Sequence, residues 1–396
     1  MIRPAIEGGN PVRKHYLPFS PPDITEKDIE AVIAVLRSGW ITRGAECEKF
    51  EKALASYTGA RHAVVLSSAT AGLFLTLKIA GIGNGDEVIT SPYTFAATAN
   101  VIIHTGAKPV FADVEEDTLN IDPEEILKNI KRRTKAIIAV HFAGHPADLW
   151  TIREIAASNR LLLIEDAAHA IGAALKNEKI GSGKNPSVFS FHAVKNITTA
   201  EGGAVLTDDE ALAIRLRQLS LHGQTKDAYE KLKAGNWQYD ITAAGYKFNM
   251  TDIQAALGRS QLERIEEIRK KRLAISSAYT EFLKNYDFVK TPVVREGVEH
   301  AWHLFPIRID SSALRIDRDG FIKALAAENI SSNVHFIPIH TMSFYRITFG
   351  YEPYDFPVAY ENYLKEVSLP IHSRMEESDV KDVIEAISKL FTFYKR

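Results

Sequence analysis

Between residues 63 and 206 the chain repeats one pattern, in which a short apolar run is followed by a segment with helical spacing. Short apolar runs suit strands that are buried on both faces, and helices between successive strands are the connections that a parallel sheet requires. We therefore predict an α/β fold with a mainly parallel seven-stranded sheet and helices on both of its faces. The expected strands cover residues 63–66, 87–90, 109–111, 136–140, 161–164, 188–191 and 204–206.

The rest of the chain predicts further helices and a second domain. Thr25 suits the N-cap of a helix over residues 25–36, because Asp28 stands three residues later. Other helices are expected at 46–57, 71–79, 151–158 and, as one long amphipathic helix with a break at Gly258, at 251–286.

Beyond that long helix the pattern is that of a smaller α+β domain, with strands expected at 302–309 and 332–337. A chain of 396 residues is too long for one ordinary domain. We expect a large domain at 15–255 and a small domain at 256–396, to which residues 1–14 also belong.

Charge and composition argue against several classes of partner. The net charge of −2 offers no field that attracts nucleic acid. Two basic clusters, 131–133 and 269–272, stand beside acidic residues in helix-like stretches and are interpreted as solvated helix faces. Residues 1–14 lack the apolar core of a signal peptide, and no run of 18 apolar residues could span a membrane. We expect a cytoplasmic protein without a metal site, in which the single cysteine, Cys47, serves packing.

Several of the expected strands end in residues that could bind one ligand. Ligands of open α/β sheets gather at the carboxyl ends of the strands. Residues 67–72 (SSATAG) follow a strand and open a helix, so small side chains and free N–H groups there could hold a phosphate. The small residues could instead serve only to cap the helix, without binding a phosphate.

Two further strand ends carry ionisable side chains. The strand at 161–164 leads directly into Glu165 and Asp166, and a carboxylate placed in such a crevice needs a cationic partner. A protonated pyridine nitrogen would be one, although the carboxylate could instead cap the next turn. Lys195 stands at the exit of the strand at 188–191, where partial desolvation would lower its pKa and make it a nucleophile rather than an ordinary surface lysine. In residues 91–95, an aromatic side chain could stack on a planar ring or pack in the core.

Taken together, these stretches resemble the DegT/DnrJ/EryC1/StrS family of sugar-nucleotide aminotransferases, and the resemblance covers nearly the whole chain in order. The most specific pair is EDAAHA with SFH..KN..T.EGG. The matching stretches are SGWITRG (38–44), SSATAGL (67–73), GDEVITSPYTFAATAN (85–100), EDAAHAIGA (165–173), SFHAVKNITTAEGGAV (190–205), GYKFNMTDIQAALG (245–258) and AWHLFPIRI (301–309).

The resemblance implies the aspartate-aminotransferase (type I) fold and pyridoxal 5′-phosphate (PLP) as cofactor. It implies that Lys195 forms the Schiff base and moves the proton, and that Asp166 pairs with the pyridinium nitrogen so that the ring accepts electrons. It also implies further cofactor contacts: His169 near the phenolic oxygen, Phe95 on the ring, and Ala69, Thr70 and Ser190 at the phosphate. Some members are dehydratases with histidine in place of the lysine, and Lys195 indicates the transaminase form.

The same resemblance implies a homodimer with composite active sites. Residues 245–250 match a segment that reaches the phosphate of the neighbouring subunit. Many members read GYNYRM there, whereas this chain has Lys247 and Asn249. Lys247 could still meet a phosphate as a point charge, with Asn249 beside it.

The expected reaction is ping-pong transfer of an amino group, from L-glutamate to a keto-sugar nucleotide. Residues 221–229 and 333–345 look more like those of members that aminate C4 of a 4-keto-6-deoxy sugar than of members acting at C3. The candidate substrate residues are Trp40, Thr42, His335 and His340, and the two histidines could equally be structural. The alternatives are a PLP-dependent lyase or dehydratase, or a non-catalytic PLP-binding regulatory protein. A Rossmann-type oxidoreductase is disfavoured because no G-x-G-x-x-G follows the first strand.

Overall fold

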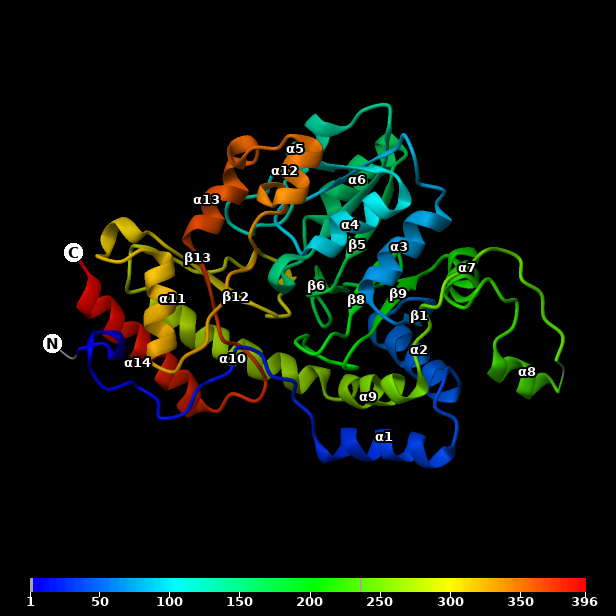
Figure 1. Cartoon of the computed structure of the whole chain (residues 1–396), viewed down its shortest axis with the longest axis horizontal. Helices are drawn as coiled ribbons and strands as arrows, with labels where there is room; N and C mark the ends of the chain where they lie inside the picture. The colour runs from blue at the N-terminus through cyan, green and yellow to red at the C-terminus, as the bar shows by residue number, and fades with distance from the viewer. Residues whose placement is uncertain (1–2, 236) are drawn as a thin grey trace.

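The computed structural model describes residues 3–235 and 237–396, and its centre is one seven-stranded sheet (Figure 1). The strand order is β1-β9-β8-β5-β4-β2-β3, in which β9 runs antiparallel to both of its neighbours and the other pairs are parallel. Its strands are β1 (His62–Leu66), β2 (Glu87–Thr90), β3 (Lys108–Phe111), β4 (Thr134–Val140), β5 (Leu162–Asp166), β8 (Ser187–Ser190) and β9 (Gly203–Thr207). All seven predicted strands are therefore confirmed, and so is the mainly parallel α/β sheet.

Helices cover both faces of this sheet, because side chains alternate along each strand. On β1, Val64 and Leu66 pack toward one layer of helices, while Ala63 and Val65 pack toward the other. The first layer contains α3 (Ala69–Ile79), α4 (Ala96–Thr105) and α7 (Glu210–Ser220). The second contains α2 (Ala45–Thr58), α5 (Pro123–Asn129), α6 (Leu149–Asn159) and α9 (Asp252–Leu262).

The N-terminal helix α1 (Glu26–Ser38) begins as the sequence predicts. Thr25 and Asp28 form a reciprocal capping box, in which the backbone N–H of Thr25 donates to the Asp28 carboxylate at 2.9 Å. Helix α1 packs along α9, beneath the sheet-bearing part in Figure 1. Its apolar residues Ile29, Ile33 and Leu36 nevertheless remain exposed.

The long helix expected at 251–286 consists of two helices, and the predicted break at Gly258 is wrong. The interruption lies instead between α9, which ends at Leu262, and α10 (Ile265–Leu283). Gly258 lies inside α9, where an added Cβ would come within 2.6 Å of the Phe50 ring and of the Thr199 methyl group. The glycine allows close packing of α9 against its neighbours and does not end the helix.

A separate group of strands and helices, called the small layer below, forms the other end of the molecule, at the left of Figure 1. Its sheet has the order β10-β12-β13, and its core includes Tyr279, Phe305, Phe321 and Phe391. The elements are β10 (Val289–Lys290), β12 (Phe305–Ile309), α11 (Arg318–Ala327), α13 (Pro357–Lys365), β13 (Glu366–Leu369) and α14 (Glu377–Tyr394). Helix α12 (Ser343–Phe349) packs instead on the central sheet, with the rings of Tyr345 and Phe111 5.9 Å apart.

The N-terminal segment joins this smaller layer. The carboxylate of Glu328 accepts hydrogen bonds from the backbone N–H groups of Ala5 and Val12, at 2.8 and 2.9 Å. We propose that the large domain spans residues 15–255 and the small domain residues 256–396, with residues 1–14 belonging to the small domain.

The strand expected at 302–309 is present as β12, but the strand expected at 332–337 is not formed. Only Asn333 pairs in the manner of a strand, with Ser368 of β13. Two residues later the backbone N–H of His335 donates to the side-chain carboxylate of Glu366, at 2.8 Å, rather than to a strand carbonyl. The Glu366 side chain thus diverts the segment from the sheet.

The basic clusters match the expected solvated helix faces only in part, with Lys270 and Lys271 exposed on α10. Residues 131–133 are exposed but lie in the turn before β4 rather than in a helix. In α10, Arg272 is buried and donates to the carbonyls of Trp302, His303 and Ile371, so it clamps three backbone segments together.

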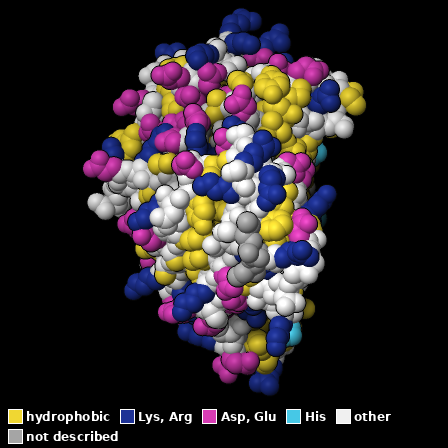
Figure 2. All heavy atoms as spheres, turned by 90° about the vertical axis from the view of Figure 1, so that its left-hand side faces the viewer, with side chains coloured by type: hydrophobic (Ala, Val, Ile, Leu, Met, Phe, Trp, Pro, Cys, Tyr) yellow, Lys and Arg dark blue, Asp and Glu magenta, His cyan; other side chains and the backbone are white. Residues whose placement is uncertain are grey.

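Charges of both signs share the molecular surface. Figure 2 shows Lys and Arg side chains interspersed with Asp and Glu over the face at the terminal end of the molecule. Cys47 is fully buried, and burial raises the pKa of its thiol, as expected of a packing residue. Within residues 3–235 and 237–396, no helix is long and apolar enough to cross a membrane.

A small sheet, a short helix and several 3-10 turns make up the remaining regular structure of the described residues. Strands β11 (Val298–Glu299), β6 (Ala174–Leu175) and β7 (Glu178–Lys179) form a separate three-stranded sheet. Helix α8 (Ala228–Ala234) lies on an excursion at the right-hand edge of Figure 1. Single 3-10 turns occur at Ala5–Glu7, Phe142–Gly144, Ser311–Ala313, Ile339–Thr341 and Pro353–Asp355.

The packing at Gly258 gives a stability prediction. Gly258→Ala should lower the free energy of unfolding by about 1–3 kcal/mol through overpacking against Phe50, although alanine favours a helix by about 1 kcal/mol. Urea unfolding measures this change. Gly83→Ala is the control, because its nearest neighbour would lie at an ordinary 3.4 Å, and it should change stability by less than about 0.5 kcal/mol. Equal or higher stability of Gly258→Ala would contradict the packing argument.

Candidate active site

A cavity of about 340 Å³ opens at the carboxyl ends of the central strands. It lies where residues following β1, β2, β5 and β8 meet, with one wall supplied by the small layer through His303, His335 and Phe336. The sequence-predicted residues that line it are Ala69, Thr70, Phe95, Asp166, His169, Ser190, Lys195 and His335. The structure therefore brings together residues that are far apart in the chain.

One end of the cavity is a cradle for an anion. Ser68 caps α3 by accepting a hydrogen bond from the N–H of Ala71 at 3.1 Å, and Ala69 and Thr70 begin the helix at the cavity wall. The first N–H groups of a helix lack partners within it and attract negative charge. At Gly203 an added Cβ would lie 2.4 Å from the N atom of Ala69, so only glycine lets β9 approach this helix start. Ser190 adds a hydroxyl to the cavity wall nearby.

Asp166 places a carboxylate at the end of β5, where it is 5% exposed. Burial raises the pKa of this carboxyl, and two hydrogen bonds oppose that effect. The Thr98 hydroxyl donates to Oδ2 at 2.7 Å, and the Ala168 N–H donates to Oδ1 at 3.2 Å. Thr94 in turn lies 3.0 Å from the Thr98 hydroxyl. The carboxylate is thus oriented for a cationic partner in the cavity.

Lys195 lies in the turn that follows β8, with its side chain at the cavity. Burial lowers the pKa of its amine to about 8, and the negative charge of Asp166 works against that lowering. A share of the side chain is therefore an uncharged amine near neutral pH. That is the form in which a lysine attacks a carbonyl carbon.

His169 lines the cavity and lies close to two other rings. Its ring centroid lies 4.4 Å from that of His303 and 5.9 Å from that of Phe336. Burial lowers its pKa well below the usual range, so the imidazole is neutral. Its Nδ1 atom is buried without a hydrogen-bond partner among the described residues, so it is available to form a hydrogen bond with a ligand.

These features fit PLP. The cradle suits a phosphate, Asp166 suits a protonated pyridine nitrogen, Lys195 suits the aldehyde carbon, and the unpartnered His169 suits the phenolic oxygen. Phe95 is 64% exposed although it lines the cavity, so its ring is available to stack on a ligand.

Five predicted site residues lie elsewhere in the chain. Trp40 donates from its indole to the Arg43 carbonyl at 3.0 Å, and the Thr42 carbonyl accepts from the Asp252 N–H at 3.2 Å. His340 is buried and its Nε2 contacts the Pro353 carbonyl at 2.9 Å, which matches the structural alternative. None of these, nor Lys247 or Asn249, lines the cavity.

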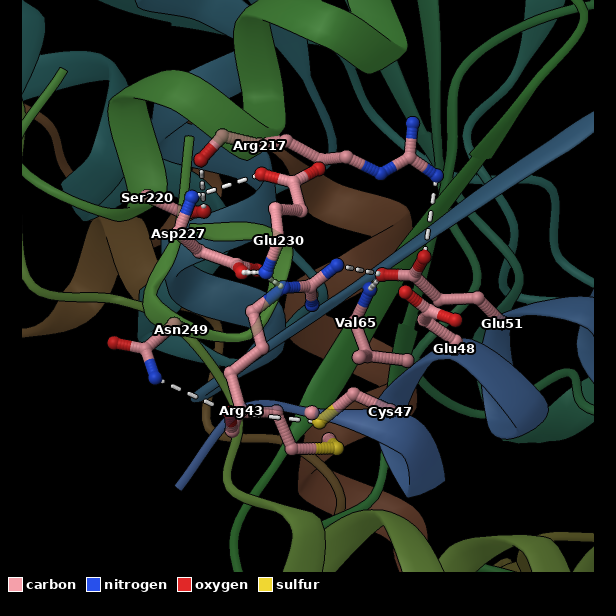
Figure 3. A network of polar contacts seen from close by, with 12 residues as sticks. Arg43, Cys47, Glu48, Glu51, Val65, Arg217, Ser220, Asp227, Glu230 and Asn249 are labelled. Carbon is pink, nitrogen blue, oxygen red and sulfur yellow. Dashed lines mark hydrogen bonds and ion pairs between the residues drawn. The ribbon is translucent and has the colours of Figure 1, made fainter. Parts of the chain in front are cut away.

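Arg43, the residue after Thr42, stands at the centre of a network of ion pairs (Figure 3). Arg43 contacts Glu51 of α2 at 3.0 Å and Asp227, the N-cap of α8, at 3.2 Å. Glu51 also pairs with Arg217 at 3.1 Å and accepts from the Val65 N–H of β1. The network therefore ties the excursion that carries α8 to the edge of the central sheet.

Sequence reasoning missed Thr98, His303 and Phe336 as cavity residues. Thr98 stands one helical turn after Phe95, so the helical spacing of the stretch 94–98 was a usable signal. His303 and Phe336 come from the small layer, and no local pattern indicates that they face Lys195.

The chain matches known proteins along nearly its whole length. The model of the DegT/DnrJ/EryC1/StrS aminotransferase family matches residues 22–388. The uncharacterized protein MJ1066 of Methanocaldococcus jannaschii is 48% identical over 96% of this chain and 98% of its own length. The spore coat polysaccharide biosynthesis protein SpsC of Bacillus subtilis is 46% identical over 95% of this chain and 97% of its own length.

Solved structures of similar shape are aminotransferases. The putative sugar aminotransferase Spr1654 of Streptococcus pneumoniae, in its PMP form, superposes with a TM-score of 0.89, at 36% identity over 95% of this chain and 99% of that one. PseC of Helicobacter pylori, an aminotransferase involved in the biosynthesis of pseudoaminic acid, gives 0.88, at 32% identity over 96% and 100%.

The Thr98 contact gives a pH prediction. Thr98→Val removes a donor that stabilises the ionised carboxylate, so the pKa of Asp166 should rise further. Asp166 would then become ionised only at higher pH, and the acid limb of the activity profile should move to higher pH, with about a tenfold loss below it. The pH dependence of amino transfer measures this shift. Thr98→Ser keeps the hydroxyl and should retain the wild-type limb, and an unmoved limb in Thr98→Val would contradict the assignment.

Proposed function

Because this chain belongs to the DegT/DnrJ/EryC1/StrS aminotransferase family, we propose that it transfers an amino group from L-glutamate to a keto-sugar nucleotide. The enzyme is a PLP-dependent aminotransferase of the type I fold. The observation that carries the proposal is that Lys195, Asp166 and the phosphate cradle line one cavity.

Asp166 and Lys195 have separate tasks in this reaction. When bound, PLP would supply an electron sink for the negative charge that develops at the substrate's Cα. The Asp166 carboxylate keeps the pyridine nitrogen protonated, which requires the ionised form that Thr98 and Ala168 stabilise. Lys195 would bind the aldehyde carbon of the cofactor before substrate arrives. Once released, its amine would move a proton between the substrate's Cα and the C4′ carbon of the cofactor. An amine with a pKa of about 8 can both take and return that proton near neutral pH.

The other cavity residues position the cofactor. The α3 N-terminus and the hydroxyls of Thr70 and Ser190 bind the phosphate, and neutral His169 offers its ring to the phenolic oxygen. Phe95 covers one face of the ring. Together they limit rotation of the cofactor, so that its reactive carbon stays beside Lys195.

The acceptor is proposed to be a 4-keto-6-deoxy sugar linked to a nucleotide. The support for C4 is the likeness of residues 221–229 and 333–345 to members that act there. The similar proteins include a putative sugar aminotransferase and a spore coat polysaccharide biosynthesis protein, and both agree with a sugar acceptor. His335 lines the cavity and is the proposed sugar contact, whereas Trp40 and Thr42 are proposed contacts outside the cavity of their own chain.

The half-reaction with the donor tests the proposal. Adding L-glutamate to the purified, PLP-loaded enzyme should shift the cofactor band from about 400–430 nm to about 330 nm, as the cofactor gains the amino group. In Lys195→Ala this absorbance shift should be absent or much slower than in wild type. The variant loses both the bond that holds the cofactor and the amine that transfers the proton. Asp166→Asn should bind PLP but lose at least about 10³-fold in rate.

Controls separate folding from chemistry in this experiment. Lys184→Ala changes an exposed lysine that pairs with Glu178; neither residue lines the cavity, so this variant should behave as wild type. Substrate elimination without amino transfer would favour the lyase or dehydratase alternative. Normal PLP binding with no response to any amino donor would favour a non-catalytic protein and overturn the proposal.

A homodimer with composite active sites is part of the same proposal. Lys195 is the only Lys or Arg among the described residues that line the cavity, so this lining offers a phosphate no second Lys or Arg side chain. Tyr246 and Phe248 pack on Phe74, with ring centroids 5.1 and 6.3 Å apart. Because side chains alternate along an extended segment, Lys247 points away from them, and it is exposed. It is proposed, with Asn249, to reach the phosphate of a second copy.

Mixed dimers test this arrangement. Lys195→Ala and Lys247→Ala should each have low activity as homodimers. When the two are co-expressed, one of the two sites in each mixed dimer combines an intact Lys195 with an intact Lys247. Purified mixed dimers should therefore recover about half of the wild-type activity. No recovery, or a monomer in sedimentation that binds PLP with wild-type affinity, would rule out the composite site.

A further inference from the structure

Strand β13 carries two polar side chains on one face, although the whole strand is buried. Its sequence is Glu366-Val367-Ser368-Leu369, and each residue is fully buried. Val367 and Leu369 belong to the core of the small layer. Since side chains alternate along a strand, Glu366 and Ser368 both face the opposite side, where the segment 332–337 passes.

The two polar residues connect directly to His335. The Ser368 hydroxyl donates to Oε1 of Glu366 at 2.5 Å, and the same oxygen of Ser368 lies 2.9 Å from Nδ1 of His335. The other carboxyl oxygen of Glu366 accepts the backbone N–H of His335 at 2.8 Å. His335 is stacked against Phe19, with ring centroids 5.3 Å apart. These contacts leave Nε2 as the ring nitrogen available to a ligand in the cavity.

Glu366 is buried without an ion-pair partner. None of the ion pairs between described residues includes it, although Arg308 and Arg318 lie near enough to favour its charged form. Arg318 donates to the backbone carbonyl of Glu366 at 3.0 Å, and Arg308 donates to the Glu116 carbonyl. Burial dominates and raises the pKa of Glu366 to about 8. The buried Tyr93 is the remaining titratable neighbour.

We propose that Glu366, Ser368 and His335 form a proton relay, in which Glu366 and Ser368 are positioning residues that decide whether Nε2 of His335 donates or accepts a hydrogen bond in the active-site cavity. The proposal rests on the contacts described above. Its meaning for catalysis rests on the proposed function, since the ligand of Nε2 would be the substrate bound next to Lys195.

The direction of the hydrogen bonds follows from counting protons. When Glu366 is ionised, the Ser368 proton must point to it, so the Ser368 oxygen accepts from Nδ1–H and the neutral ring keeps a bare Nε2. When Glu366 is protonated, its proton points to Ser368, the serine proton points to Nδ1, and the ring proton is on Nε2. One proton on Glu366 therefore converts Nε2 from an acceptor into a donor.

His335 itself stays neutral during this change. Burial lowers its pKa to about 4, and the positive charge of Lys195 adds to the lowering. His169 and His303, which also line the cavity, are likewise neutral. Below the Glu366 pKa, Nε2–H can donate to an acceptor such as a keto oxygen or a carboxylate of a substrate. Above it, the bare nitrogen suits a hydroxyl donor instead.

Nitrogen NMR of the histidine rings tests the relay without any substrate. In a neutral imidazole the protonated and bare nitrogens resonate far apart, so the tautomer is read directly, and His335→Gln identifies the signals. Wild type should carry its ring proton on Nε2 at about pH 6 and on Nδ1 at about pH 9.5, on either side of the Glu366 pKa. In Glu366→Gln the amide donates to Ser368 at every pH, so the proton should stay on Nε2.

Kinetics in the same variants test the consequence. Ser368→Ala should lower kcat/KM for the keto-sugar nucleotide about tenfold, and Ser368→Thr, which keeps the hydroxyl, should restore most of it. Ser276→Ala is the matched control, because Ser276 is equally buried but bonds only the Leu273 carbonyl in α10. Lys195 titrates in the same range, so the relay is isolated by comparing wild type with Glu366→Gln, which should lose the tautomer change but keep the Lys195 limb.

The outcomes separate the relay from the proposed function. A tautomer change in wild type that is absent in Glu366→Gln supports the relay even if no keto-sugar is aminated. The same His335 tautomer at both pH values, or a change that persists in Glu366→Gln, overturns it. A relay seen by NMR together with unchanged kcat/KM in Ser368→Ala would overturn its role toward substrate.

Discussion

The carboxylate of Asp166 is buried at the end of β5 and forms no ion pair with any described residue. Burying a carboxylate without a cation is costly, and the hydrogen bonds from Thr98 and Ala168 offset only part of that cost. Lys195, whose amine is destabilised in its charged form, lines the same cavity. A cofactor with a cationic ring nitrogen and an aldehyde relieves both, which explains why the cavity is built around these two groups.

The central sheet supplies the rigidity that this arrangement needs. Parallel strands end at one edge, so residues separated by more than a hundred positions in the chain reach the same cavity. The small layer then closes one wall through His303, His335 and Phe336. The proposed cofactor contacts lie mainly on the part of the molecule that contains the seven-stranded sheet, while the proposed relay lies on the small layer. Positioning of the substrate can therefore be tuned by residues that do not hold the cofactor.

The sequence predicted the fold more completely than it predicted the site. Seven buried strands follow from apolar runs, because burial on both faces leaves a plain local signal. Gly258 was misread as a break because its close packing against Phe50 depends on a distant helix. The segment 332–337 was expected to be a strand because its pattern does not reveal that the Glu366 side chain takes the His335 N–H. Thr98 and His303 were missed because their roles arise only when separate segments meet.

Borohydride reduction followed by peptide mapping shows directly whether Lys195 holds the cofactor. Reduction fixes PLP covalently to the lysine that holds it, and mass spectrometry of the peptides identifies that residue. We expect one pyridoxyl group per chain, located on Lys195 at the edge of the central sheet. Labelling of a different lysine, or a PLP-saturated protein without any labelled lysine, would contradict it.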